Sequence, residues 1–95
     1  MLQIQDFGGA QGQTFDLDMG TATITLTLDT IAPLPVHRFP GMMRDPFSLL
    51  FRSSSPVVLP QRIYKLSNQR MGDIDVFLVP IARDVQGIAY QAVFN

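Results

Sequence analysis

The chain has no cysteine and no glutamate, and all eight of its acidic residues are aspartate. Without cysteine there is no disulfide framework, no thiolate nucleophile and no metal site with sulfur ligands. Lys65 is the only lysine and His37 the only histidine. Helical surfaces are usually built from Glu, Lys, Ala and Gln, whereas this chain uses Thr, Ser, Asp and Gln, which suit strands and turns. The composition therefore favours an all-β fold.

Strong net charge and long apolar runs are also absent. The net charge is −1 at pH 7, and the six arginines are interspersed with the aspartates, so no basic cluster forms to attract nucleic acid or anionic lipid. No apolar run approaches the ~20 residues of a membrane-spanning helix. The first residues, MLQIQDF, lack the basic and apolar regions of a signal peptide. We therefore expect a cytoplasmic protein with neither nucleic acid nor membrane among its partners.

The length and apolar content fit one domain over residues 1–95. The 95 residues, 46% of them hydrophobic, are enough to bury roughly 65% of the unfolded surface. Residues 5–12, QDFGGAQG, contain three glycines, which disfavour a helix. They also lack the Lys and Ser/Thr that complete a phosphate-binding loop. We therefore interpret residues 1–12 as an N-terminal arm and residues 13–95 as the folded body.

The clearest pattern in the chain is the alternation TATITLTLD over residues 21–29, a period of two that is typical of a strand with one buried face. Before it, Asp18, Met19 and Gly20 predict a tight hairpin turn, because glycine can adopt the positive φ that such a turn needs. The same reasoning predicts strands at residues 14–17, 21–31, 47–52, 62–66, 71–81 and 88–94.

Five principal strands and a short first one are too few for an immunoglobulin-type sandwich and fit a small barrel. In such barrels the long strands bend to serve two packed sheets, which suits residues 21–31 and 71–81 and places Pro80 at an edge or bulge. We predict a small, strongly bent, partly open antiparallel barrel that is SH3-like or Sm-like in shape. An OB-type barrel and a small sandwich are the alternatives.

Several segments resemble the motifs of a family of small uncharacterised bacterial domains. These are RDPFSLLFR at residues 44–52, LPQRIYKL at 59–66, and DVFLVPI with GIAYQAVFN within 75–95. The resemblance covers most of the domain and is weakest across residues 1–12 and 32–43. It implies a compact all-β domain without an assigned activity, found beside tail-collar or tail-fibre-like proteins. The glycine and asparagine signature by which Sm proteins hold RNA bases is not legible here, so RNA binding is the least favoured function.

Residues that could carry catalysis or bind metal are few. A Ser-His-Asp arrangement would need His37 together with Ser48 or the serines at 53–55, and no GxSxG elbow supports it. A zinc site would need aspartate ligands around this single histidine, without a supporting spacing. A loop histidine and turn-forming serines are the simpler interpretation. We predict no catalytic residue, no metal ligand and no cofactor site.

Two groups of aspartates have a functional and a structural interpretation. Asp16, Asp18 and Gly20 resemble the start of a calcium loop, but the acids that should follow are missing and a hairpin turn explains them. Asp73 and Asp75 lie on one face of a predicted strand, about 7 Å apart, within reach of an acid/base pair or a bridged metal. A solvated strand face that discourages edge pairing explains them without a further assumption and is the interpretation we favour.

The long loop at residues 32–46, APLPVHRFPGMMRDP, is the main candidate for function. Its four prolines remove backbone donors, and structureless loops of this length in compact domains are often functional. It is rich in the residue types found at protein interfaces. It forms either an interface or a lid over an open barrel end. The candidate interaction residues are His37, Arg38, Phe39, Met42, Met43 and Arg44.

The leading hypothesis is a non-enzymatic structural or protein-interaction module. It pairs with itself, as a dimer, or with another protein through this loop and an open strand edge. The resemblance extends the hypothesis to a phage-tail-like assembly. The alternative is a small-molecule-binding or catalytic β-barrel whose pocket lies between the loop and Tyr64 or Tyr90.

Overall fold

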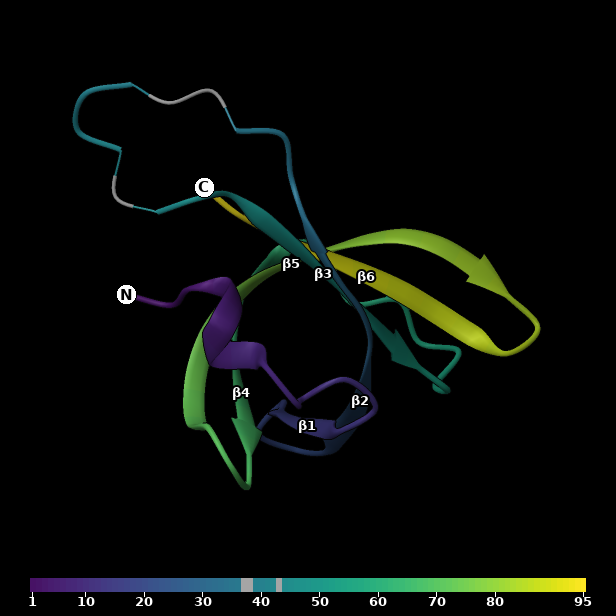
Figure 1. Cartoon of the computed structure of the whole chain (residues 1–95). Helices are drawn as coiled ribbons and strands as arrows, with labels where there is room; N and C mark the ends of the chain where they lie inside the picture. Colours follow the sequence, from purple (N-terminus) through teal and green to yellow (C-terminus); the bar gives the residue numbers. More distant parts are fainter. Residues whose placement is uncertain (37–38, 43) are drawn as a thin grey trace.

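The threonine-rich alternation forms a strand, β2 (Thr23–Pro33), in which Leu26 and Leu28 are fully buried and the threonines at 23, 25 and 27 are exposed. The computed structural model describes residues 1–36, 39–42 and 44–95 (Figure 1). Its other elements are η1 (Ile4–Phe7), β1 (Thr14–Asp18), β3 (Phe47–Ser53), β4 (Arg62–Asn68), β5 (Gly72–Asp84) and β6 (Gly87–Phe94). In the described part of the chain, no helix has the length and apolarity needed to cross a membrane.

The six strands form a closed antiparallel barrel in the order β1-β2-β3-β6-β5-β4. The predicted small antiparallel all-β barrel is therefore confirmed, but it is closed where the sequence suggested that it is partly open. The closure is short, because β1 and β4 pair only at Asp16 with Ser67 and at Leu17 with Leu66. Leu17 and Leu66 are fully buried. The two strands that would otherwise be the sheet edges, β1 and β4, therefore both contribute to the hydrophobic core where they pair.

Both long strands bend at irregularities in their pairing. The β2–β3 register shifts between Leu28 and Thr30, and the β5–β6 register shifts between Pro80 and Ala82. A bulge leaves one residue outside the ladder and increases the local twist. Pro80 thus lies beside a bulge, as its missing N–H predicts.

The inside of the barrel is filled by side chains from all six strands. Phe47 and Phe94 stack with their ring centroids 4.6 Å apart, and Phe15 meets Phe51 edge-on at 5.4 Å. Tyr90 is the largest of the fully buried side chains. The interior therefore serves as a packed core.

Residues 1–12 do not form the free arm predicted from their glycines. Phe7 and Ala10 are fully buried, and the Phe7 ring lies 5.9 Å from the rings of both Phe47 and Phe94. The N–H of Gly12 donates to the carbonyl of Leu28 at 2.7 Å. This segment covers the end of the barrel at which β3 begins and β6 ends, because the hydrophobic side chains there would otherwise meet water.

Candidate functional site

The long loop joins the end of β2 to the start of β3 and is tied at its base. Pro33 and Phe47 are the last pair of the β2–β3 ladder, and the N–H of Leu34 then donates to the carbonyl of Pro46 at 3.0 Å. Figure 1 shows the described parts of the loop extending away from the barrel, with the base of the loop beside the C-terminus. The first two residues of the predicted loop belong to β2, so the loop comprises residues 34–46.

The tip of the loop contains a tight turn at residues 39–42. The N–H of Met42 donates to the carbonyl of Phe39 at 3.2 Å, and Gly41 has a φ of +87°. Proline followed by a glycine with positive φ is typical of a type II turn, and Pro40 and Gly41 occupy those positions. Phe39 is 63% exposed. The described part of the loop therefore does not act as a lid, and Phe7 covers that end of the barrel instead.

A hollow of about 370 Å³ lies between the loop and the C-terminus. Its walls come mainly from the apolar parts of the loop, and the other side is the end of β6. The lining residues are Pro35, Phe39, Gly41, Met42, Arg44, Pro46 and Asn95.

Arg44 holds the base of the loop to both ends of the chain. Its Nε donates to the carbonyl of Asn95 at 2.8 Å, and one Nη donates to the carbonyl of Leu2 at 2.6 Å. The guanidinium also lies 5.3 Å from the centroid of the Phe94 ring, within cation–π range. Arg44 is thus an anchor within the chain, whereas the sequence had grouped it with the partner-contacting residues.

The six predicted interaction residues therefore divide into three groups. Phe39 and Met42 border the hollow at the loop tip, and Arg44 anchors the loop. The remaining three, His37, Arg38 and Met43, lie outside the described residues.

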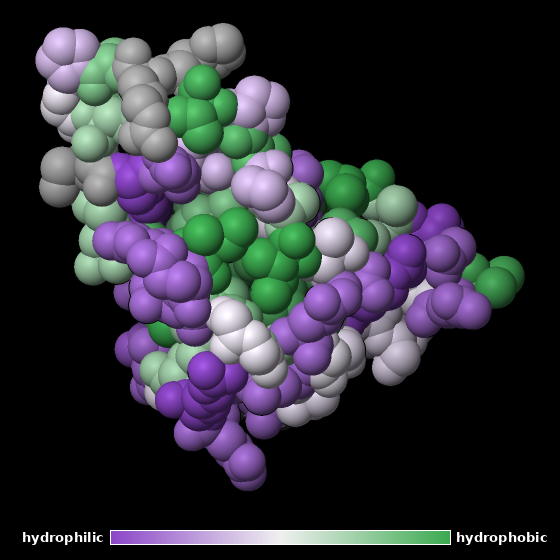
Figure 2. All heavy atoms as spheres, in the orientation of Figure 1, coloured by the Kyte–Doolittle hydropathy of each residue, from purple (hydrophilic) through white to green (hydrophobic). Residues whose placement is uncertain are grey.

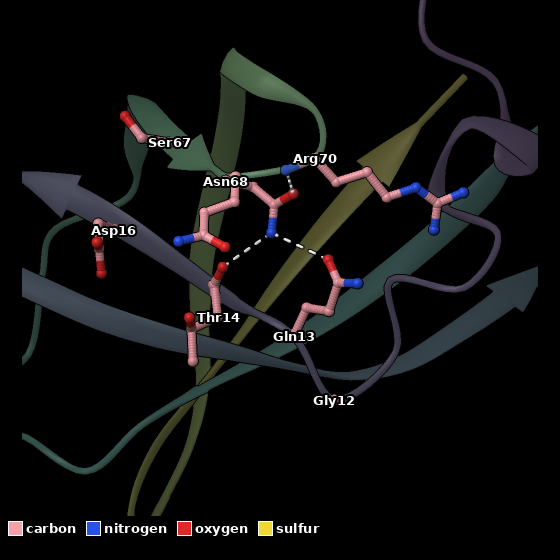
Figure 3. A pocket seen from close by; sticks show the side chains of 8 residues that line it. Gly12, Gln13, Thr14, Asp16, Ser67, Asn68 and Arg70 are labelled. Atoms are coloured by element: carbon pink, nitrogen blue, oxygen red, sulfur yellow. Dashed lines mark hydrogen bonds between the residues drawn. The ribbon is translucent and has the colours of Figure 1, made fainter.

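A polar cleft of about 520 Å³ lies along the short seam between β1 and β4 (Figure 3). Asn68, which is 8% exposed, lies at its centre. Its Nδ2 donates to the Gln13 side chain at 3.2 Å and to the Thr14 carbonyl at 2.9 Å, while its Oδ1 accepts the N–H groups of Arg70 and Met71. All four hydrogen-bonding positions of this amide are used. Asn68 therefore connects the β4–β5 turn to β1.

Two other polar side chains that line this cleft, Asp16 and Ser67, have hydrogen-bond partners beside it. Asp16 accepts the hydroxyl of Thr25 at 3.0 Å, and Ser67 donates to Asp73 at 2.9 Å. Figure 3 shows the Arg70 side chain running away from the Asn68 amide. Because these groups already have partners within the protein, we assign the cleft to the stability of the seam.

A family model matches residues 2–94, a range that includes the barrel, the N-terminal segment and the loop. The chain belongs to the family described as Domain of unknown function (DUF6916). The resemblance to an uncharacterised family is thereby confirmed at that level. No curated protein and no solved structure matches the chain.

The serines considered as nucleophiles serve turns in this family member. The hydroxyl of Ser53 accepts the N–H of Ser55 at 3.1 Å, and the hydroxyl of Ser55 accepts the N–H of Val57 at 3.2 Å. Ser48 lies within β3, opposite Val93. Hydroxyls that satisfy neighbouring backbone groups in this way fit the structural interpretation.

The aspartates considered as metal or acid/base residues also make local structural contacts. Asp18 accepts the N–H of Gly20 at 2.7 Å and so stabilises the hairpin turn. Asp73 is bonded to Ser67, and Asp75 lies opposite Lys65 in the β4–β5 ladder. Within residues 1–36, 39–42 and 44–95, no three acidic or histidine side chains come together as a metal site.

Among the described residues, neither Tyr64 nor Tyr90 lines the hollow beside the loop, where the sequence placed them around a shared pocket. Tyr90 is 1% exposed, and its oxygen accepts the N–H of Leu59 at 3.0 Å. Tyr64 donates to the carbonyl of Pro60 at 2.6 Å. Both tyrosines therefore brace the segment before β4, at the end of the barrel opposite Phe7.

A further apolar surface lies on the outer face of the barrel. Ile63 on β4 and Phe77 on β5 are directly paired and are 67% and 47% exposed, and Val93 on β6 is 46% exposed. Figure 2 shows hydrophobic residues gathered at the centre of its view, where Figure 1 draws β3, β5 and β6, with hydrophilic residues around them. Contiguous exposed apolar surface of this kind is typical of contact with another protein.

Proposed function

We propose that this domain is a non-enzymatic protein-interaction module whose contact element is the loop at residues 34–46. The observation that carries the proposal is Phe39, a large aromatic side chain that is 63% exposed at the tip of a tight turn. Aromatic residues and methionine are enriched at protein interfaces, and buried aromatic anchors dominate binding energy. Met42 lies beside Phe39 around the same hollow and can adapt its shape to a partner.

The base of the loop is held in place before any partner arrives. The Leu34–Pro46 hydrogen bond closes it, and Arg44 ties it to the carbonyls of Leu2 and Asn95. Prolines further reduce the number of conformations that the loop can adopt. A loop whose base is held in advance loses less entropy on binding, so more of the contact energy of Phe39 contributes to affinity.

The partner we propose is another protein, and the first case to test is a second copy of this chain. Because β1 pairs with β4, neither of these strands offers a fully open edge, so we base self-association on the loop. The family resemblance of residues 44–52 and 59–66 supports a place in a phage-tail-like assembly.

The proposed location of the protein is the cytoplasm. The SH3-like or Sm-like shape of the barrel stays a prediction.

The test compares Phe39→Ser with Val85→Ser in the whole chain. Val85 lies in the β5–β6 turn and is fully exposed, so it is a matched hydrophobic residue outside the loop. In sedimentation equilibrium over a wide concentration range, we expect Phe39→Ser to weaken self-association at least tenfold and Val85→Ser to leave it unchanged. An oligomer whose mass is the same in both variants would contradict the role of the loop.

If the wild-type protein is a monomer throughout, a photo-crosslinking residue at position 39 tests for another partner. We then expect position 39 to crosslink a discrete protein in cells that carry the natural gene, and the same crosslinker at position 85 not to do so. Equal crosslinking from both positions would show that the loop has no special role.

A further inference from the structure

The first part of β2 has a hydrogen-bonding neighbour on one side only. The β1–β2 ladder extends to Asp18 and Thr23, whereas the β2–β3 ladder begins at Leu26 and Ser53. Residues 23–25 of β2 therefore form a stretch of sheet that β3 does not reach. The closure of the barrel between β1 and β4 does not cover it, because that pairing lies on the far side of β1.

The hydrogen bonds at each end of the β1–β2 ladder show which backbone groups point toward that open side. The N–H of Met19 donates to the carbonyl of Ala22, and the N–H of Leu28 donates to the carbonyl of Gln13. Even-numbered residues of β2 therefore face β1. Because the groups alternate along a strand, the N–H and carbonyl of Thr23 and Thr25 face the opposite side. Within the described residues, no strand pairs with them there.

The chain after β3 explains why the ladder ends. The Ser53 hydroxyl takes the N–H of Ser55, and Pro56 has no N–H to offer, so the chain leaves the sheet after Ser53. It then crosses the end of the barrel to reach β4, with Leu59 buried on the way. A groove of about 600 Å³ remains between residues 21–25 and the segment at residues 53–59.

This edge lacks the features that usually protect edge strands. Residues 21–25 read TATIT, with neither a charge nor a proline, whereas exposed edges are commonly guarded by lysine, proline or a bulge. Apolar side chains border the groove as well, because Ile24 and Met19 are only partly buried and Val57 is 59% exposed. An uncharged strand suits such a surface, since a charged one would lose hydration without gaining a partner.

We propose that this groove binds an extended, uncharged peptide segment of a partner protein, which adds a strand to β2 at Thr23 and Thr25. Backbone hydrogen bonds then supply affinity, and alternate side chains of the peptide contact Ile24 and Val57. The wall at residues 53–59 favours a single extended chain. A second copy that presented its own β2 edge would also carry its own segment at residues 53–59, and the two segments would keep the two edges apart. This surface is separate from the loop at residues 34–46, so the two proposals can fail independently.

The first measurement is amide hydrogen exchange by NMR on the free, dilute protein. We expect the amides of Thr23 and Thr25 to exchange at least a hundredfold faster than those of Ile24 and Leu26, which are bonded to β1. Slow exchange at Thr23 and Thr25 would show that the edge is already covered, and this would overturn the proposal.

The second measurement uses a library of random dodecapeptides displayed on phage and selected on the whole protein. We expect selected peptides to have alternating β-branched or apolar residues with few charges, and to protect the amides of Thr23 and Thr25. Methylating the peptide nitrogens that face β2 should weaken binding at least tenfold, and methylating the alternate nitrogens should not. Selections that yield no binder, or only binders that leave these two amides unprotected, would refute the proposal that the groove binds a peptide.

A variant pair separates this site from the loop. Thr25→Pro removes an N–H that no strand of the barrel pairs with, and it also removes the hydroxyl that Asp16 accepts. Thr25→Ala, which loses only the hydroxyl, is therefore its control. We expect Thr25→Pro to bind the selected peptides at least tenfold more weakly than Thr25→Ala does. Phe39→Ser should leave that affinity unchanged. If Thr25→Pro does not fold, the methylated peptides still decide the question. Loss of peptide binding in Phe39→Ser would place the binding site at the loop and contradict the proposal.

Discussion

Replacing Phe7 with alanine tests whether the N-terminal segment is part of the fold. Phe7 is fully buried, and its ring lies 5.9 Å from the rings of Phe47 and Phe94, in tilted contact with both. Removing a buried phenylalanine typically costs about 3–5 kcal/mol, through lost burial and the cavity that remains. Against a total stability of about 5–15 kcal/mol, this loss is large for a segment that the sequence describes as an arm.

The assay is urea unfolding of the wild type and the Phe7→Ala variant, followed by circular dichroism. With a denaturant slope of about 1–3 kcal/mol/M, the expected loss moves the midpoint down by at least about 1 M. Val85→Ala is the control, since Val85 is fully exposed and its truncation should change stability by less than about 0.5 kcal/mol. If Phe7→Ala changes the stability by less than about 1 kcal/mol, Phe7 does not cover the barrel and the reasoning is refuted.

Two further substitutions test close contacts in the barrel. Gly87→Ala should destabilise the protein by about 3 kcal/mol or more, because Gly87 has a φ of +132° and a Cβ there would collide with the carbonyl oxygen of Ser53. A thermal unfolding curve that matches the wild type would contradict this contact. Tyr90→Phe should cost about 1–3 kcal/mol, because it leaves the buried N–H of Leu59 without its acceptor. The measurement is amide hydrogen exchange at Leu59, which should become faster in the variant. An unchanged exchange rate would exclude the hydrogen bond between Leu59 and Tyr90.

The local patterns of the sequence were sufficient to predict the strands. Alternation over residues 21–31 predicted β2, and the aspartate and glycine before it predicted the hairpin turn that Asp18 and Gly20 form. Pro80 predicted either a sheet edge or a bulge in β5, and the register shift beside it shows that it is a bulge. These features depend on the two-residue period of the pleat and on the φ preferences of glycine and proline, which are properties of neighbouring residues.

Predictions of contacts between distant segments were less successful. The glycines of residues 5–12 correctly excluded a long helix, but nothing local to them showed that Phe7 packs against Phe47 and Phe94. The composition of the loop made Arg44 a candidate for partner contact, and only the fold brings it to the carbonyls of Leu2 and Asn95.

The sequence by itself thus determined the strands, their turns and the position of a long proline-rich loop. Only the tertiary structure decided that β1 meets β4, that Phe7 covers one end of the barrel, and that β3 stops before it reaches Thr23 and Thr25. The physical reason is that strand conformation follows from the side chains and backbone of adjacent residues. Which strands share an edge, and which edge remains open, depends on how the whole barrel buries its core.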